Sequence, residues 1–236
     1  MTTFGLVHGA WHGAWCFERL VPELETRGHR ALAMDLPCDD PSATFEDYAE
    51  VALGALGDVG DDLVLVGHSL GAHTIPLVAL RRPVRSMVFL CGVVPPSATN
   101  PDAPEEPPMD EPGTFGALGK DGRGSVVWTD ADAAISAMYP DCAPEDGRWA
   151  ASKLKPQGQA IWRGFSPIDP WPDVPSASIV CAEDKLLRPA WGRWAALGRL
   201  GGAPVVEIPG GHSPFLARPA ALADLLASDP VLGVAR

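Results

Sequence analysis

The chain has 236 residues, 46% of them hydrophobic, which is enough for one sizeable hydrophobic core. Its 18 basic and 30 acidic side chains give a formal net charge of −12, which repels nucleic-acid phosphates and anionic lipid surfaces. No apolar run approaches the roughly 20 residues of a membrane-spanning helix, so neither nucleic acid nor a membrane is an expected partner.

The five cysteines are scattered and form neither a C-x-x-C motif nor a cluster with histidine. Cys91 and Cys181 lie in apolar runs, where free thiols behave as small hydrophobic side chains. Residues 4–7 already have a strand pattern, with no basic or apolar leader before them. These features favour the reducing cytoplasm. The close histidine pairs lack a third ligand, so we expect no metal, and nothing requires an organic cofactor.

Short apolar runs alternate with longer helical patterns, which indicates βαβ units around a parallel sheet. The apolar runs predict strands at residues 3–7, 31–34, 63–66, 85–91, 177–181 and 204–208. Helices are predicted at residues 16–26, 45–56, 70–80, 189–200 and 214–227. Because the strands are continuously apolar, we expect an α/β fold with a mostly parallel sheet of about six strands, buried on both faces.

This rhythm changes between the fourth and fifth predicted strands. A proline-rich, acidic stretch at 95–113 resists regular structure and predicts a solvated loop, with a lid hinge as the alternative. A capping pattern at 129–132 predicts a helix to Met138, and a second helix is expected at 144–154. We therefore expect a core at 1–94 and 176–236 and a small, mainly helical cap at 95–175. The cap contains five aromatic residues, which predict an apolar lid. The alternative is that they form only the cap's own small core: Trp128, Tyr139, Trp149, Trp162 and Phe165.

The sequence Gly67-His68-Ser69-Leu70-Gly71 follows the apolar run 63–66 and precedes a helical pattern. A tight strand-to-helix turn presents such a serine as a nucleophile, and glycines beside it avoid collisions with neighbouring backbone. The same residues also fit an ordinary connector with a capping serine. The assignment of Ser69 as a nucleophile therefore depends on partners elsewhere in the chain.

Two partners follow Ser69 along the chain, each after a predicted strand. Glu183 and Asp184 follow strand 177–181, and His212 lies on a glycine-rich loop after strand 204–208. Functional groups of parallel α/β sheets gather at these strand ends. We expect His212 to be the general base and Asp184, in preference to Glu183, to orient it. Asp184 as a helix cap and His212 as a structural loop residue stay open as alternatives.

A nucleophilic serine that attacks a carbonyl also needs two N–H donors for the oxyanion. The N–H of Leu70, next after the nucleophile, is one candidate. The other is expected in the loop after the first strand, His8-Gly9-Ala10-Trp11-His12-Gly13-Ala14-Trp15, where Ala10 is the preferred donor. A plain glycine-rich turn is the alternative for this loop.

Together these elements resemble the α/β-hydrolase superfamily. The loop 8–15 resembles more narrowly the group of plant methylesterases, hydroxynitrile lyases and their bacterial relatives. The resemblance covers roughly residues 3–94 and 176–228 and is weaker across the cap. It implies an α/β-hydrolase fold and a Ser-His-Asp triad made of Ser69, His212 and Asp184.

Within that group, the lyases typically have threonine after the first motif's histidine and lysine after the catalytic histidine. The present chain has Gly9 and Ser213 at these positions. Without an ammonium group there, a departing cyanide is not neutralised in the same way, which favours hydrolysis. We expect Gly9, Trp11, His68 and Ser213 to surround the substrate.

We therefore expect a serine hydrolase that cleaves a carboxylic ester of a small hydrophobic or aromatic molecule through an acyl-enzyme. Cyanohydrin cleavage, thioester hydrolysis and carbon–carbon bond hydrolysis use the same triad and stay open. A small-molecule receptor on the same fold is an alternative of a different class. Whether the protein forms a homodimer is also left open.

Overall fold

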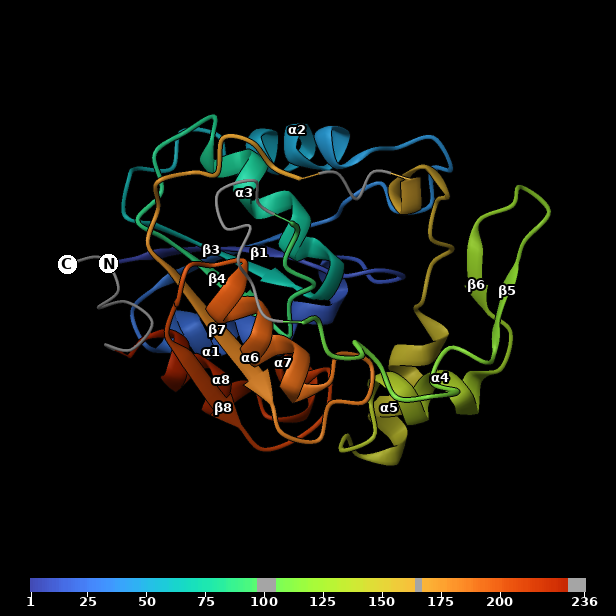
Figure 1. Ribbon diagram of the computed structural model, residues 1–236. Coiled ribbons are helices and arrows are strands. Elements are labelled where there is room, and N and C mark those ends of the chain that lie inside the picture. The colour runs from blue at the N-terminus through green and yellow to red at the C-terminus, as the bar shows by residue number, and fades with distance from the viewer. Residues whose placement is uncertain (97–104, 164–166, 229–236) are drawn as a thin grey trace.

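In the computed structural model, which describes residues 1–96, 105–163 and 167–228, a parallel sheet runs through the centre of the molecule (Figure 1). Its strand order is β2-β1-β3-β4-β7-β8. The strands are β1 (Thr3–Val7), β2 (Arg30–Met34), β3 (Leu63–His68), β4 (Ser86–Leu90), β7 (Ser176–Cys181) and β8 (Val205–Ile208). Since β1 lies between β2 and β3, the loops after β1 and β3 start from adjacent strand ends.

Helices cover both faces of this sheet. The helix α2 (Phe45–Leu56) packs beside α3 (Thr74–Ala79) over one face, and α1 (Leu20–Thr26) packs beside α8 (Pro219–Leu226) over the other (Figure 1). The α2 boundaries agree with the prediction. A capping box begins this helix, since the Thr44 hydroxyl accepts a bond from the Asp47 N–H while the Asp47 carboxylate accepts one from the Thr44 N–H. The helix α6 (Pro189–Gly198) packs against β7.

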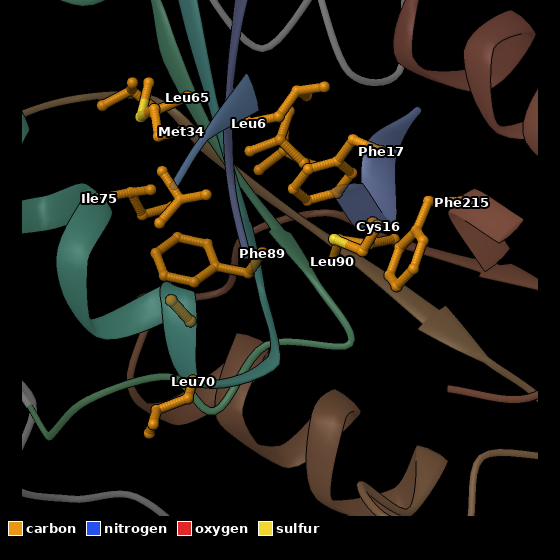
Figure 2. Packing of buried hydrophobic residues seen from close by; sticks show 14 of the residues in the cluster. Leu6, Cys16, Phe17, Met34, Leu65, Leu70, Ile75, Phe89, Leu90 and Phe215 are labelled. Atoms are coloured by element: carbon orange, nitrogen blue, oxygen red, sulfur yellow. The ribbon is translucent and has the colours of Figure 1, made fainter. Parts of the chain in front are cut away.

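The hydrophobic core lies on both sides of the central strands. Figure 2 shows Leu6, Phe17 and Phe215 on one side and Met34, Leu65 and Ile75 on the other. All residues of β1, β3 and β4 are buried, as the apolar runs predict. The prediction of burial on both faces is wrong for β2 and β8, because these strands lie at the sheet edges and expose part of their side chains.

Three predicted helices are interrupted, each near a proline. The predicted helix at 16–26 is a 3₁₀ turn η1 (Ala14–Phe17) followed by α1, in which Pro22 lies in the first turn. The predicted helix at 70–80 is likewise η2 (Ser69–His73) followed by α3, with Pro76 in the first turn. The predicted helix at 214–227 divides into α7 (Pro214–Ala217) and α8, which begins at Pro219. Proline has no N–H to continue a preceding helix, so each helix restarts around it.

The segment between β4 and β7 contains both helices and strands. Its helices are α4 (Ala131–Met138), α5 (Pro144–Ser152) and the 3₁₀ helix η3 (Ala160–Arg163), and Asp130 caps α4. The prediction of a mainly helical cap is incomplete, because β5 (Leu118–Lys120) and β6 (Val126–Trp128) form an antiparallel hairpin (Figure 1). Phe165 and part of the acidic stretch lie outside the described residues. The division of the chain into core and cap stays a prediction.

None of the described helices has both the length and the apolar composition needed to cross a bilayer.

Candidate active site

The backbone at Ser69 has the strained geometry of a sharp turn. Its φ angle is +49°, in the left-handed region that non-glycine residues rarely adopt. A Cβ at Gly71 would lie 2.6 Å from the backbone oxygens of Val7 and His8, so only glycine lets η2 approach the end of β1 this closely. The Ser69 side chain stays partly exposed. The glycine-serine-glycine motif is therefore a tight turn that presents the serine at the strand ends.

His212 and Asp184 form a buried pair. The two side chains are 3% exposed or less, and Nδ1 of His212 lies 2.7 Å from Oδ2 of Asp184. The other carboxylate oxygen, Oδ1, accepts bonds from the backbone N–H groups of Leu186 and Leu187, both at 2.9 Å. Asp184 thus contacts the imidazole and also binds the turn that follows it. It is not the helix cap that was the alternative, because the N-cap of α6 is Arg188 and has no side-chain bond. The Glu183 carboxylate instead accepts a bond from the Gly210 N–H.

Three residues expected around the substrate lie behind the serine and histidine. His68 donates from Nε2 to the carbonyl of His212 at 3.0 Å, which ties the serine turn to the histidine loop. Ser213 is fully buried directly after His212. A Cβ at Gly9 would lie 2.7 Å from the Cβ of Ser69, so this glycine packs against the serine itself. These residues support the site from behind and are absent from the described lining of the cavity.

A cavity of about 640 Å³ opens above Ser69, well within the range of small-molecule sites. Five predicted residues line it together with Ser69: Ala10, Trp11, Leu70, His212 and, from the predicted lid aromatics, Trp162. Much of its wall was not foreseen: Met109, Phe115, Met138, Leu186, Leu187 and Trp191. Two residues of the predicted solvated loop, the exposed Glu106 and the half-buried Met109, also line this cavity. Leu186 and Leu187 lie two and three residues after Asp184, and this proximity is the one sequence signal that pointed to them.

The loop after β1 orients one peptide group toward the cavity. Burial lowers the pKa of His8 to about 4, so its ring is neutral at neutral pH. Its Nδ1 donates to the carbonyl of Gly9 at 2.8 Å, while Nε2 accepts from the Leu36 N–H at 3.0 Å. Because a trans peptide directs its C=O and N–H to opposite sides, this contact turns the Ala10 N–H away from His8. Among the described residues, that N–H has no protein acceptor.

His12 holds the next carbonyl of this loop. Burial lowers its pKa to about 3, so it is also neutral. Its Nδ1 donates to the Ala10 carbonyl at 2.7 Å, and its Nε2 accepts from the Tyr139 hydroxyl at 2.8 Å. Tyr139 lies at the end of α4. Tyr139, from the segment between β4 and β7, therefore fixes the His12 imidazole that positions the loop after β1.

The contacts that hold Trp11 come from the segment between β4 and β7. Its φ angle is +63°, a strained conformation for a large side chain. The Trp11 N–H donates to Oε1 of Gln157 at 3.3 Å, its carbonyl accepts from the Lys155 N–H at 2.8 Å, and its indole donates to the Val126 carbonyl at 3.0 Å. Gln157 is fully buried. The sequence did not identify it, because it lies in a stretch without periodic pattern.

One group of side chains near the pair has the spacing of metal ligands. Sulfur, oxygen and nitrogen atoms of Cys91, Asp184 and His212 all lie within 4.8 Å of one another. However, a hydrogen bond with Cys181 and burial raise the pKa of the Cys91 thiol, and metal ions bind the thiolate. The His212 nitrogen that faces Asp184 is also already engaged. The chemistry of this donor set does not fit a resident metal.

Comparison with known proteins gives one family. A family model, the alpha/beta hydrolase family, matches residues 6–225. Methylesterase 2 of Arabidopsis thaliana is 29% identical over 247 residues, and the alignment covers 94% of each chain. Alpha-hydroxynitrile lyase of the same plant is 28% identical over 248 residues, covering 95% of each chain.

The solved structures agree on the fold. A pyrethroid hydrolase from Sphingobium faniae JZ-2 superimposes with a TM-score of 0.82 at 24% sequence identity, over 97% of each chain. The expected parallel sheet flanked by helices is thereby confirmed. Since the family model matches nearly the whole chain, this protein belongs to the alpha/beta hydrolase family.

Proposed function

We propose that the protein is a carboxylic ester hydrolase that acts through an acyl-enzyme on Ser69. The observation that carries this proposal is the buried pair of His212 and Asp184, whose imidazole lines the same cavity as the strained serine. The methylesterase relatives support the same chemistry. The apolar cavity wall favours a small hydrophobic or aromatic ester over a sugar or a peptide.

The reaction begins when His212 removes the proton of Ser69, which attacks the ester carbonyl. The resulting oxyanion accepts hydrogen bonds from the N–H groups of Ala10 and Leu70. His212 then protonates the leaving alcohol, and an acyl-enzyme forms. Water activated by the same imidazole releases the acid and restores Ser69. Throughout these steps Asp184 holds the tautomer of His212 and stabilises the imidazolium.

The packing around Gly9 supports hydrolysis over cyanohydrin cleavage. A side chain at this position would collide with the Cβ of Ser69, so a threonine hydroxyl has no place there without movement of the backbone. Ser213 likewise has no charge for a departing cyanide. These two positions distinguish the chain from the lyase pattern described above.

Hydrolysis of short 4-nitrophenyl esters tests the proposal. We expect Ser69→Ala and His212→Ala to lower kcat by roughly 10⁴ or more while both variants stay folded, since the triad acts as a unit. A fluorophosphonate probe should label wild type at Ser69 and leave Ser69→Ala unlabelled. Near-normal activity of either variant contradicts the mechanism. No turnover together with retained ligand binding supports a receptor instead.

A reducing compartment such as the cytoplasm is part of the same proposal. The five cysteines are free thiols, and four of them are buried. Cys91 is hydrogen-bonded to Cys181, so an oxidising compartment would favour a disulfide bond between these two residues.

The oligomeric state is a separate question. Light scattering of the purified protein decides between a monomer and the homodimer left open by the sequence.

A further inference from the structure

The wall of the cavity holds one charged pair. Among the described lining residues, only Glu106 carries a carboxylate and only Arg199 a guanidinium; apart from three histidines and Ser69, the others are apolar. Arg199 follows the last residue of α6, whereas Glu106 comes from the segment between β4 and β5. Two distant parts of the chain thus bring opposite charges to the edge of an otherwise apolar site.

Several contacts fix this pair in place. Arg199 donates from Nη1 to the Val94 carbonyl at 2.6 Å and from Nη2 to both Glu106 oxygens at 3.2 and 3.3 Å. The indole of Trp191 donates to Oε1 of Glu106 at 2.7 Å. The guanidinium lies 5.3 and 4.9 Å from the ring centres of Trp191 and Trp194. The side chains remain 18% and 48% exposed for Arg199 and Glu106, respectively. The pair is therefore both held and accessible.

An ion pair of this kind contributes little to the stability of an apolar cavity wall. Partial burial removes water from Arg199 and lowers its pKa, although Glu106 acts in the opposite direction. Desolvation of an ion pair often offsets the attraction between its charges, and apolar side chains of similar volume stabilise proteins equally well or better. Stability alone therefore does not explain why these charges line the cavity.

We propose that Glu106 and Arg199 bind a hydroxyl group at the end of the substrate that is remote from the ester. This inference rests on the proposed ester hydrolysis. A carboxylate would be repelled by Glu106, and an ammonium by Arg199, whereas a hydroxyl both donates and accepts hydrogen bonds. It donates to Glu106 and accepts from the guanidinium N–H groups that the described contacts leave unused. The substrate is thus an apolar ester with a distal alcohol or phenol.

Matched pairs of esters test this assignment. Each pair differs only in a terminal hydroxyl, over a series of chain lengths, with the hydroxyl on the acyl side in one series and on the alcohol side in another. We expect wild type to prefer the hydroxy ester by about 10- to 100-fold in kcat/KM within one range of lengths, the effect of a hydrogen bond to a charged group. The preference should vanish outside that range.

The double variant Glu106→Leu with Arg199→Met replaces both charges with apolar groups. We expect it to fold and to hydrolyse the unsubstituted esters, but to lose the preference for the hydroxy esters. Its stability should also fall, because the buried indole N–H of Trp191 and the Val94 carbonyl lose their partners. Arg193→Met is the matched control, because Arg193 lies on α6, which Arg199 follows, and pairs with Glu207 at the surface. It should keep the preference.

The outcomes are distinguishable. A wild type without preference in either series, or a double variant that retains it, overturns the hydroxyl site. If the double variant loses stability but keeps the preference for hydroxy esters, the pair only stabilises the contact between the end of α6 and the segment between β4 and β5. If wild type hydrolyses no ester in either series, the proposed function fails instead.

Discussion

Gln157 offers the sharpest test of how the loop after β1 is held. Gln157→Met keeps the length of the side chain but removes both of its hydrogen bonds, to the Trp11 N–H at 3.3 Å and to the Tyr48 hydroxyl at 3.0 Å. Each buried polar group that loses its partner costs about 1–3 kcal/mol, so we expect the free energy of unfolding to fall by about 2–6 kcal/mol. Urea unfolding measures this loss.

The same variant should also lose activity. The backbone of Trp11 is strained by about 1–2 kcal/mol, and without its bond to Gln157 it is expected to relax and move the adjoining Ala10 N–H. Loss of one oxyanion donor lowers kcat by about 10²–10³, whereas KM should change less, because most of the cavity wall comes from residues other than Trp11.

The matched control is Tyr48→Phe. This variant removes the other partner of Gln157 and leaves the bond to Trp11 in place. It should cost about 1–3 kcal/mol of stability with kcat near that of wild type. Equal losses of kcat in both variants, or full activity of Gln157→Met, would refute the reasoning that this amide positions the donor.

Asp184→Asn should lower kcat by about 10³–10⁴ because it disturbs the tautomer of the catalytic imidazole, and steady-state kinetics showing less than about a tenfold loss would reassign the acid. Gly71→Ala, whose Cβ would lie 2.6 Å from backbone oxygens, should destabilise the fold by about 1–3 kcal/mol or more, whereas Gly54→Ala on the open face of α2 should stabilise it by about 0.5–1 kcal/mol; equal urea midpoints would contradict this contrast. His8 and His12 have folded pKa values of about 4 and 3, below their unfolded value of 6.5, so the unfolded chain binds more protons in acid. Stability should therefore fall by on the order of 2 kcal/mol per histidine between pH 7 and pH 5, and a flat urea midpoint over this window would show that these rings are protonated in the fold.

The central sheet could be predicted from the sequence because the local pattern of apolar residues determines its strands. Continuous apolar runs predicted the buried strands, and the strand ends in turn located Ser69, Asp184 and His212. The helix boundaries were less accurate, since prolines such as Pro76 restart a helix without interrupting its apolar periodicity. Edge strands were misjudged for a similar reason: an apolar run does not reveal whether a neighbouring strand covers it.

The sequence by itself determined the resemblance to the family, the succession of the six strands of the central sheet along the chain, and the three residues at strand ends that are proposed to carry the chemistry. These features depend on neighbours along the chain, where spacing and residue type are directly visible. The tertiary structure alone decided how the site is built and what it admits. Gln157 against Trp11, Tyr139 against His12, and Glu106 against Arg199 each join residues far apart in the chain. Such contacts arise where the segment between β4 and β7 packs against the loop after β1 and the end of α6, and no periodicity in the sequence encodes them.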